Sequence, residues 1–400
     1  MREAVQRISI LMSALAALAC SCLADEWPTY MHDPARSGVT PEEVRPPLSE
    51  RWVFIPTHPP RPAWPPPKPV PVEGVLEPNK LDFDTAFHVV SDGERVYFGS
   101  SADYKVYCLD ADTGEVIWSF ATGGPVRLAP TLWKGRGYFG SDDGFVYCLD
   151  AESGKLIWRF KAAPRDERVI GNGRIISLWP VRTGVLVDKG VAYFGAGVFP
   201  YEGVYLYAVD AESGKLIWRN DSWGYFRSGW GSRSPQGYLL ADSKRLFVPT
   251  GRTLPACFSR EDGKLLYHPG FTWGVGKTDL VGGCYALVVG DYLYSGARVV
   301  TALDRRSGKA GLIWFPGRRI IVTVDTSYLL TGEELMALDR SAYHAAGQKR
   351  ERLRREISSI NRTKYSLERE RRSLQKRKDE LESSLRTTEG EIKKLLSSGR

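Results

Sequence analysis

Short apolar runs separated by turn-forming residues cover most of the chain. Runs such as 95–100 (RVYFGS) and 106–109 (VYCL) are rich in aromatic and β-branched residues, which is typical of β-strands. The segment at 110–114 (DADTG) supplies a glycine for a positive φ and an aspartate that accepts hydrogen bonds from turn amides. The pattern therefore predicts antiparallel strands joined by tight turns.

One strand-turn-strand unit recurs along the chain and ends in tryptophan in its best copies. The copies are 108–118 (CLDADTGEVIW), 148–158 (CLDAESGKLIW) and 208–218 (AVDAESGKLIW), and more weakly 257–267, 302–314 and 337–340. Each copy is preceded by further strand patterns, so a unit has four antiparallel strands at a period near 40 residues, which is typical of a β-propeller blade. We expect the large terminal rings to pack between neighbouring blades. These residues are Trp118, Trp158, Trp218 and Trp314.

The signature D-A-x-[TS]-G-x-x-x-W resembles the repeat of pyrroloquinoline-quinone (PQQ) type propellers, over about Trp52 to Tyr343. That family includes quinoprotein alcohol dehydrogenases and outer-membrane assembly lipoproteins of the BamB kind. The resemblance implies an all-β propeller of four-stranded antiparallel blades. It is specific for the repeat and does not select an activity within the family.

About six blades can be placed, and residues 50–54 (ERWVF) read as one more outer strand, of the kind that closes a ring by pairing with the last blade. Because eight blades are usual in the resembling family, we interpret the ring as an incomplete eight-bladed propeller, with a small complete ring as the alternative. The last unit has its Ala-Leu-Asp strand, but a charged helix begins where its outer strand should be. The predicted blades are 83–120, 124–161, 179–220, 233–269, 283–316 and the partial 318–340.

The last 60 residues carry the whole charge excess. The chain has a net charge of +8, and 341–400 holds 17 basic and nine acidic residues. The charge balance of the rest argues against a uniformly basic nucleic-acid-binding domain, and no specific nucleic acid is expected. Residues 349–396 follow a heptad pattern that predicts a coiled-coil helix. Its d positions are Ile360, Leu367, Leu374, Leu381, Thr388 and Leu395, and its a positions are Ile357, Lys364, Arg371, Lys378, Leu385 and Ile392.

This helix has three interpretations. The first is self-association or pairing with a partner through residues 349–396. The second is a solvated charged helix, or an insertion that folds back as a hairpin in a longer protein. The third is binding of an anionic lipid or polymer through its Arg/Lys clusters, although interleaved glutamates dilute their field.

The N-terminus reads as an export signal, with two arginines, an apolar run at 8–19 and cleavage before Asp25. An alternative cleavage would leave Cys20 lipidated and would anchor the protein. Either route predicts a periplasmic or cell-envelope location. The predicted organisation is a signal peptide (1–24), an N-terminal segment with a proline-rich connector (25–82), the propeller (83–340) and the basic helix (341–400).

The chain shows little catalytic chemistry. Its four later cysteines form no CxxC pair, so no metal site is predicted. Cys108 and Cys148 lie at equivalent points of two repeats and are expected to be buried on strands. Quinoprotein dehydrogenases, which the repeat resembles, use two adjacent cysteines, a calcium ion held by Glu, Asn and Asp, and an aspartate base. This propeller region has no Cys-Cys pair and few asparagines. We therefore predict no catalytic, cofactor-binding or metal-binding residue, and PQQ with calcium only if the chain is a truncated or divergent dehydrogenase.

One set of residues predicts a ligand face, because arginines and a flat ring suit recognition of a sugar, an anionic polymer or a protein. The alternative is that these rings pack between blades while the arginines bridge loops. The preferred function is an exported binding or scaffold propeller without catalysis; the alternatives are a divergent PQQ-dependent dehydrogenase and an envelope assembly lipoprotein. The predicted face consists of Arg182, Arg227, Trp230, Arg233 and Arg252.

Overall fold

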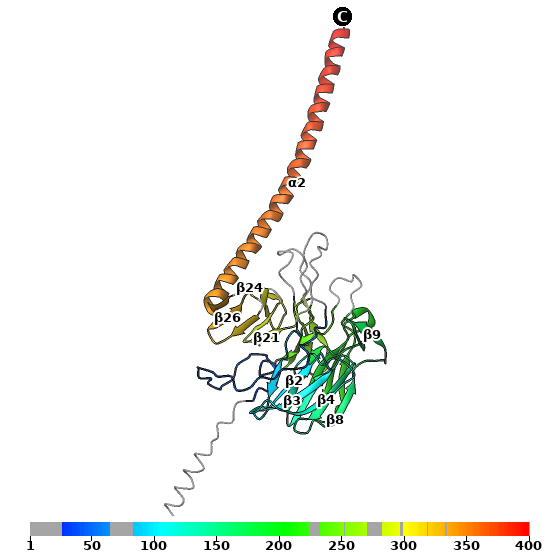
Figure 1. Cartoon of the computed structure of the whole chain (residues 1–400). Coiled ribbons are helices and arrows are strands. Elements are labelled where there is room, and N and C mark those ends of the chain that lie inside the picture. The colour runs from blue at the N-terminus through cyan, green and yellow to red at the C-terminus, as the bar shows by residue number, and fades with distance from the viewer. Residues whose placement is uncertain are drawn as a thin grey trace, which may run out of the picture. The chain divides into compact units, whose positions relative to one another are not determined.

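The computed structural model divides the chain into two compact units, Met1–Arg340 and Ser341–Arg400. The first is built from β-strands and the second is helical, as Figure 1 shows. The residues that the structure describes are 26–64, 83–224, 233–251, 253–269, 282–296, 299–317, 319–332 and 334–399, without the side chains at 310–314 and 316.

Five four-stranded antiparallel sheets follow one another among the described residues, each with its strands in chain order. The first is β1 (Val89–Ser91), β2 (Arg95–Ser100), β3 (Lys105–Asp110) and β4 (Val116–Ala121). The second is β5 (Thr131–Trp133), β6 (Arg136–Gly140), β7 (Phe145–Asp150) and β8 (Leu156–Lys161). The third is β12 (Leu186–Asp188), β13 (Val191–Ala196), β14 (Tyr205–Asp210) and β15 (Leu216–Asn220).

The fourth sheet is β17 (Leu240–Ala241), β18 (Arg245–Val248), β19 (Ala256–Ser259) and β20 (Leu265–Tyr267). The fifth is β21 (Ala286–Val289), β22 (Tyr292–Ser295), β23 (Val299–Asp304) and β24 (Ala310–Pro316). The sixth has three strands, β25 (Arg319–Val322), β26 (Thr326–Leu330) and β27 (Leu335–Asp339). Smaller elements are the hairpin β9 (Arg168–Gly171) and β10 (Arg174–Ser177), the parallel pair β11 (Thr183–Gly184) and β16 (Gly237–Tyr238), and the 3-10 turn η1 (Pro200–Glu202).

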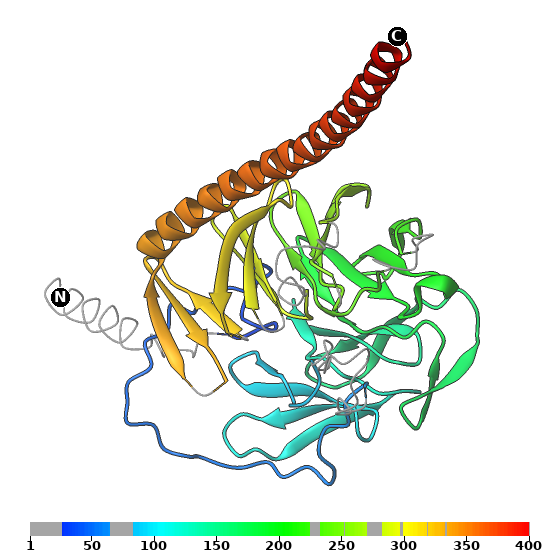
Figure 2. The same ribbon diagram turned by 90° about the horizontal axis from the view of Figure 1, so that it is seen from above.

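Neighbouring sheets pack through apolar clusters, as the side-by-side sheets in Figure 2 illustrate. Between the first and second sheets, the buried cluster includes Val106, Phe139 and Tyr147. Equivalent clusters join the second sheet to the third and the third to the fourth. The predicted β-rich, propeller-like architecture of four-stranded antiparallel sheets is confirmed, while the number of blades in a closed ring stays a prediction.

The repeated turn between the last two strands of a sheet explains its sequence. Asp110 Oδ1 accepts the backbone N–H of Thr113 at 2.8 Å and its hydroxyl at 3.0 Å. These bonds lower the pKa of Asp110. Gly114 adopts a φ of +73°, a conformation that a side chain would strain. The same arrangement recurs in three later turns, with glycines Gly154, Gly214 and Gly308.

The spacing of the tryptophans, 40 and then 60 residues, also has a structural reason. The 20 additional residues before Trp218 include the hairpin β9–β10, which forms its own two-stranded sheet. The second and third blades therefore keep the common four-stranded plan, and the insertion is placed outside it.

The predicted extra strand at 50–54 is only half correct. Trp52 donates its indole N–H to the carbonyl of Ala111 at 2.9 Å, and Phe54 lies 5.5 Å from the ring of Phe98. These contacts place the segment against the first sheet as an outer strand would lie. However, residues 50–54 are not in a strand and are not paired with β27. Among the described residues, no hydrogen-bonded ladder joins the edge of β27 to this segment, so the predicted ring closure is not found there.

The second unit is one helix, α2 (Arg340–Ser398), which follows β27 directly. Its 59 residues correspond to a length of about 90 Å at 1.5 Å per residue. The helix starts before the predicted heptads at 349–396 and contains all of them without a break. No helix among the described residues is both long and apolar enough to cross a bilayer.

Candidate functional site

The terminal tryptophan of one sheet packs on the turn of the next. Trp118 Nε1 donates to the carbonyl oxygen of Ala151 at 3.1 Å. A Cβ atom on Gly154 would lie 2.6 Å from the Trp118 ring, so only glycine leaves room for the indole. Trp158 and Trp218 make the equivalent bonds at 3.1 and 2.9 Å. The side chain of Trp314 lies outside the described residues.

The N-terminal segment 27–36 lies where the first strands of several sheets converge. Trp27 pairs with Ser91 beside β1, and the carbonyl of Pro28 accepts the N–H of Leu132 in β5. The carbonyls of Pro34 and Ala35 accept N–H groups from β17 and β21 at 2.9 Å. Because this segment bonds to four sheets, the chain itself occupies the space between their inner strands.

Aromatic rings and one arginine fill the centre around this segment. Tyr30 stacks on Tyr238 with ring centroids 3.8 Å apart. Arg36 is buried and donates to the carbonyl of Leu239 at 2.9 Å. Burial lowers the pKa of Arg36 to about 10, which leaves it cationic at neutral pH.

His88 belongs to the same cluster and is held neutral. Its Nδ1 lies 2.8 Å from the hydroxyl of Tyr238, whose oxygen also accepts the N–H of Ala129. Burial, with a contribution from Arg319, lowers the pKa of His88 to about 4. The neutral imidazole is therefore positioned to accept a hydrogen bond from the tyrosine hydroxyl, which keeps its own proton because burial raises the pKa of Tyr238.

A buried network of two carboxylates and two guanidinium groups joins the first three sheets. Arg127 lies 2.6 Å from Asp84 and 2.8 Å from Asp142, and Arg182 reaches Asp142 with two bonds of 3.1 Å. The four side chains are at most 2% exposed. Burial opposes ionisation of Asp142, but the two arginines outweigh it and hold its pKa below the usual value.

Residues 61–64 cover this network. The carbonyl of Arg61 accepts a bond from Arg127 at 2.9 Å, and the N–H of Ala63 donates to Asp84 at 2.8 Å. The guanidinium of Arg182 lies 5.2 Å from the ring centroid of Trp64. Each charge of the network thus has a partner inside the protein, and residues 61–64 shield the network from solvent.

This closed network does not fit a quinone cofactor. Such a cofactor is a planar anion, and its carboxylates would need cationic partners, whereas Arg127 and Arg182 are already neutralised by Asp142 and Asp84. Within the described residues, no three or more His, Cys, Asp or Glu side chains lie together as metal ligands would.

The predicted ligand face is described only in part. Arg182 lies in the buried network, and Arg233 is 7% exposed and donates its backbone N–H to Gly224 at 2.9 Å. Burial, aided by Arg233, lowers the pKa of His268 to about 3. The remaining predicted residues lie outside the described ones; they are Arg227, Trp230 and Arg252.

Sequence reasoning missed Asp84, Arg127 and Asp142. A signal was present for the arginine, because Pro-Val-Arg occurs at 125–127 and again at 180–182. No sequence pattern marks the two aspartates, whose partners lie 15 to 43 residues away. The four later cysteines are free and buried. Cys108 and Cys148 lie on strands, as expected, and so does Cys257.

The hairpin β9–β10 presents a strongly exposed cross-strand apolar pair. Ile170 and Ile175 lie directly opposite each other and are 82% and 61% exposed. An Asn-Gly turn with positive φ at Asn172 and Gly173 joins the strands. The amide of Asn172 donates to the carbonyl of Pro62 at 3.0 Å, which ties the hairpin to the segment that covers the charge network.

Comparison with known proteins decides the family. The family model described as outer membrane protein assembly factor BamB matches residues 76–178 and 202–342, more than half of the chain. The chain belongs to this family. The BamB-type, PQQ-like repeat that the sequence resembles is thus confirmed. None of the curated proteins compared with the chain matched it.

Solved structures of both kinds of relative are similar to the chain. BamB from Moraxella catarrhalis is 15% identical, with 64% of this chain and 70% of that one covered and a TM-score of 0.46. A quinohemoprotein alcohol dehydrogenase from Comamonas testosteroni is 16% identical over 80% and 52%, with a TM-score of 0.46. A europium-containing methanol dehydrogenase is 17% identical over 61% and 53%, with a TM-score of 0.44. The chain spans about half the length of these two dehydrogenases.

Proposed function

We propose that this BamB-family chain is an exported binding propeller that holds a protein partner in the cell envelope and carries out no catalysis itself. The observation that carries the proposal is the closed network of Asp84, Arg127, Asp142 and Arg182 beneath residues 61–64. Its charges are used to join sheets, so they support a rigid scaffold rather than a reaction centre. The family's description as an assembly factor supports the same conclusion.

The hairpin β9–β10 is our candidate contact for that partner. Ile170 and Ile175 form a cross-strand apolar pair that no neighbouring side chain covers to any large extent. Burying one isoleucine side chain in an interface contributes about 1.5–3 kcal/mol. A sugar would gain little from two aliphatic side chains without a ring or a charge, so the pair favours a protein.

A photoreactive amino acid at position 170, in the cells that naturally make the protein, tests this contact. We expect a discrete protein adduct whose yield falls when Ile175 is changed to Ser. The matched control places the same group at the exposed Glu212, in the turn before β15. The same adducts from both positions, or binding to a purified glycan that is unaffected by Ile170→Ser and Ile175→Ser, would contradict the proposed contact.

The dehydrogenase alternative has its own test. Purified protein incubated with PQQ and calcium is expected to show neither the quinone absorbance nor dye reduction with alcohols. Arg127 and Arg182 would have to leave their carboxylates to bind the quinone. Both signals appearing together would replace the binding function with catalysis.

A further inference from the structure

The helix α2 carries an apolar seam that is exposed along its whole length. Nine leucine and isoleucine side chains at a and d positions are 45–72% exposed. A seam of this kind buries its side chains only against another helix. The residues are Leu353, Ile357, Ile360, Leu367, Leu374, Leu381, Leu385, Ile392 and Leu395.

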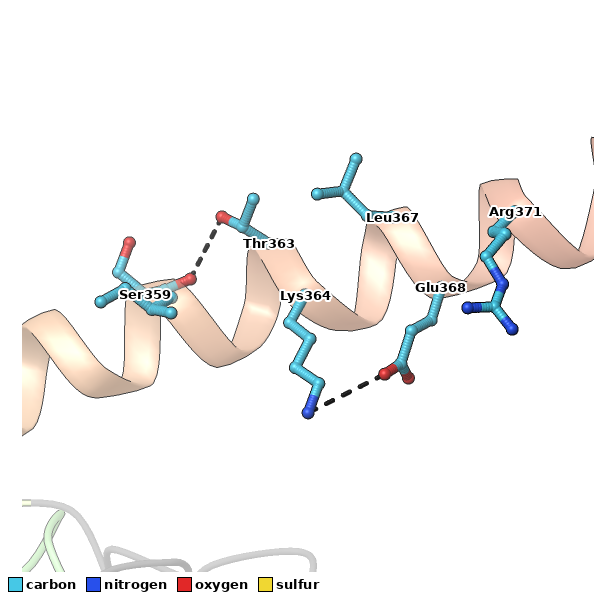
Figure 3. Close-up of a pocket in the computed structure, with 7 residues that line it drawn as sticks. Ser359, Thr363, Lys364, Leu367, Glu368 and Arg371 are labelled. Carbon is cyan, nitrogen blue, oxygen red and sulfur yellow. Dashed lines mark hydrogen bonds and ion pairs between the residues drawn. The ribbon is translucent and has the colours of Figure 1, made fainter.

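Three basic side chains interrupt the middle of this seam. Lys364, Arg371 and Lys378 occupy three successive a positions. Figure 3 shows the first of these places: Leu367 lies between Lys364 and Arg371 along the helix, and Lys364 turns toward Glu368 at 3.9 Å. A partner helix can pair stably with this seam only if it places no further cation opposite these three.

A parallel, in-register pair of identical helices fails this requirement. In that arrangement each a residue faces the same residue of the other copy. Three successive layers would then hold two cations each, at Lys364, Arg371 and Lys378. At the e and g positions that flank the seam, Lys349 of one copy would repel Arg354 of the other, and Arg377 would attract Glu382.

An antiparallel pair places no cation opposite these three basic residues, because residues at a positions then face residues at d positions. We propose that α2 pairs antiparallel with α2 of a second copy, in the register that sets Arg371 opposite the second copy's Leu374. The long stems of the basic residues cover leucine while their charges reach water. The other facing pairs are Lys364 with Leu381, Lys378 with Leu367, Leu385 with Ile360, Ile392 with Leu353, Ile357 with Thr388 and, at each end, Arg350 with Leu395.

Charge complementarity selects this register. At the centre Glu370 lies beside the second copy's Arg377, and nearer the ends Arg354 lies beside Glu389. Of the two registers one heptad away, the one that faces Leu353 with Leu385 would set Glu368 and Glu370 against their own copies at the centre. The other would set Arg377 against its own copy. The proposed register leaves one kind of repulsive contact, between Glu356 and the second copy's Glu391, which occurs once near each end of the pair.

Disulfide cross-linking of the full chain tests both orientation and register. The double variant Leu353→Cys with Ile392→Cys is expected to form covalent dimers on mild oxidation. The two sites are about 60 Å apart within one helix, so they cannot join in one chain. Leu395→Cys alone is expected to give no dimer, because antiparallel helices hold the two copies of that residue at opposite ends.

The controls separate this pairing from its alternatives. The unsubstituted chain and the double variant Ser366→Cys with Ser383→Cys, off the seam, give the background. Leu353→Cys with Leu385→Cys reports the register one heptad away. A strong dimer from Leu395→Cys, a stronger one from Leu353→Cys with Leu385→Cys, or sedimentation of the unsubstituted chain as a monomer at all concentrations would each overturn the proposal. It does not depend on the function proposed for the propeller.

Discussion

The propeller and the helix α2 use charge in opposite ways. In the propeller, Asp142 binds Arg127 and Arg182, which lie 15 and 40 residues away, and all three side chains are at most 2% exposed. In α2, the ion pairs join residues three or four apart, such as Lys378 and Glu382 at 3.5 Å, with side chains at least 44% exposed.

The difference has an energetic consequence. A buried pair has lost its water, so removing one partner leaves an uncompensated charge in a medium of low polarity. A solvated pair loses little when it is broken, because water and salt replace the partner. The propeller should therefore be sensitive to single charge changes, and α2 should respond mainly through its overall charge.

The largest effect is expected from Asp142→Asn. The change leaves Arg182 without its carboxylate and Arg127 with only Asp84, so the free energy of unfolding should fall by about 3–5 kcal/mol. Denaturant unfolding followed by tryptophan fluorescence measures it. The control is Asp112→Asn, which removes an exposed pair with Arg51 and should change stability by less than about 0.5 kcal/mol. Equal losses of stability in the two variants would show that the buried carboxylate is no more important for stability than the exposed one.

A smaller loss is expected where neighbouring sheets meet. Trp118→Ala removes a ring that packs on Gly154 and the bond to Ala151, and should cost about 2–4 kcal/mol. Trp118→Phe keeps much of the packing and should cost about half as much. Thermal and denaturant unfolding of both variants check this order. A larger loss for Trp118→Phe than for Trp118→Ala would show that packing on the turn is not the main contribution.

Acidification should weaken the propeller before it affects α2. Because burial lowers the pKa of His88 to about 4, the unfolded chain binds more protons than the folded one between about pH 6.5 and 4. This contribution is fully present above pH 6.5 and is lost as the pH falls, by about 1–2 kcal/mol between pH 7.5 and 5. Urea unfolding at both values measures it.

The matching variant is His88→Gln, which should reduce that pH dependence, whereas His58→Gln, at an exposed position, should leave it as it is. The partner group is Arg319, whose charge also disfavours protonated His88. If His88→Gln kept the full loss of stability on acidification, His88 would not contribute to it, and the other buried histidine, His268, would be the candidate cause.

The smallest effect on stability should come from α2. Changing Arg369, Arg372 and Lys376 to Gln should alter the free energy of unfolding by less than about 0.5 kcal/mol. The same variant should elute from a cation exchanger at clearly lower salt, because the charge excess lies in 341–400. The matched set changes the exposed propeller residues Lys155, Lys161 and Lys215 to Gln. Equal shifts for both sets would mean that retention follows total charge and not its position.

Much of the propeller could be predicted from local patterns. The turn at 110–114 and the strands around it are encoded by neighbouring residues, because a glycine with positive φ and an aspartate that caps the turn act over a few positions. The same pattern, repeated, predicted successive sheets. The candidate site could not be predicted in this way, since Asp84, Arg127 and Asp142 lie in three different loops that meet only when the sheets pack.

The segment 50–54 shows where prediction from local sequence patterns ends and where the packing of distant parts of the chain decides the structure. Its Trp-x-Phe pattern matches that of β4 and β8, and Trp52 and Phe54 do lie against the first sheet. The prediction was that the segment would form an outer strand paired with the last blade. Whether its free edge pairs with β27 depends on distances across the propeller, which no local pattern contains.

The sequence by itself determined the repeating strands and turns, the heptad seam of α2 and the separation of charge between the two units, because each follows from residues close together in the chain. The tertiary structure alone decided that segment 27–36 occupies the space between the inner strands and that 61–64 closes the network around Asp142. The physical reason is that a buried charge is stable only when it is paired. Packing, and not distance along the chain, decides which residue can be its partner.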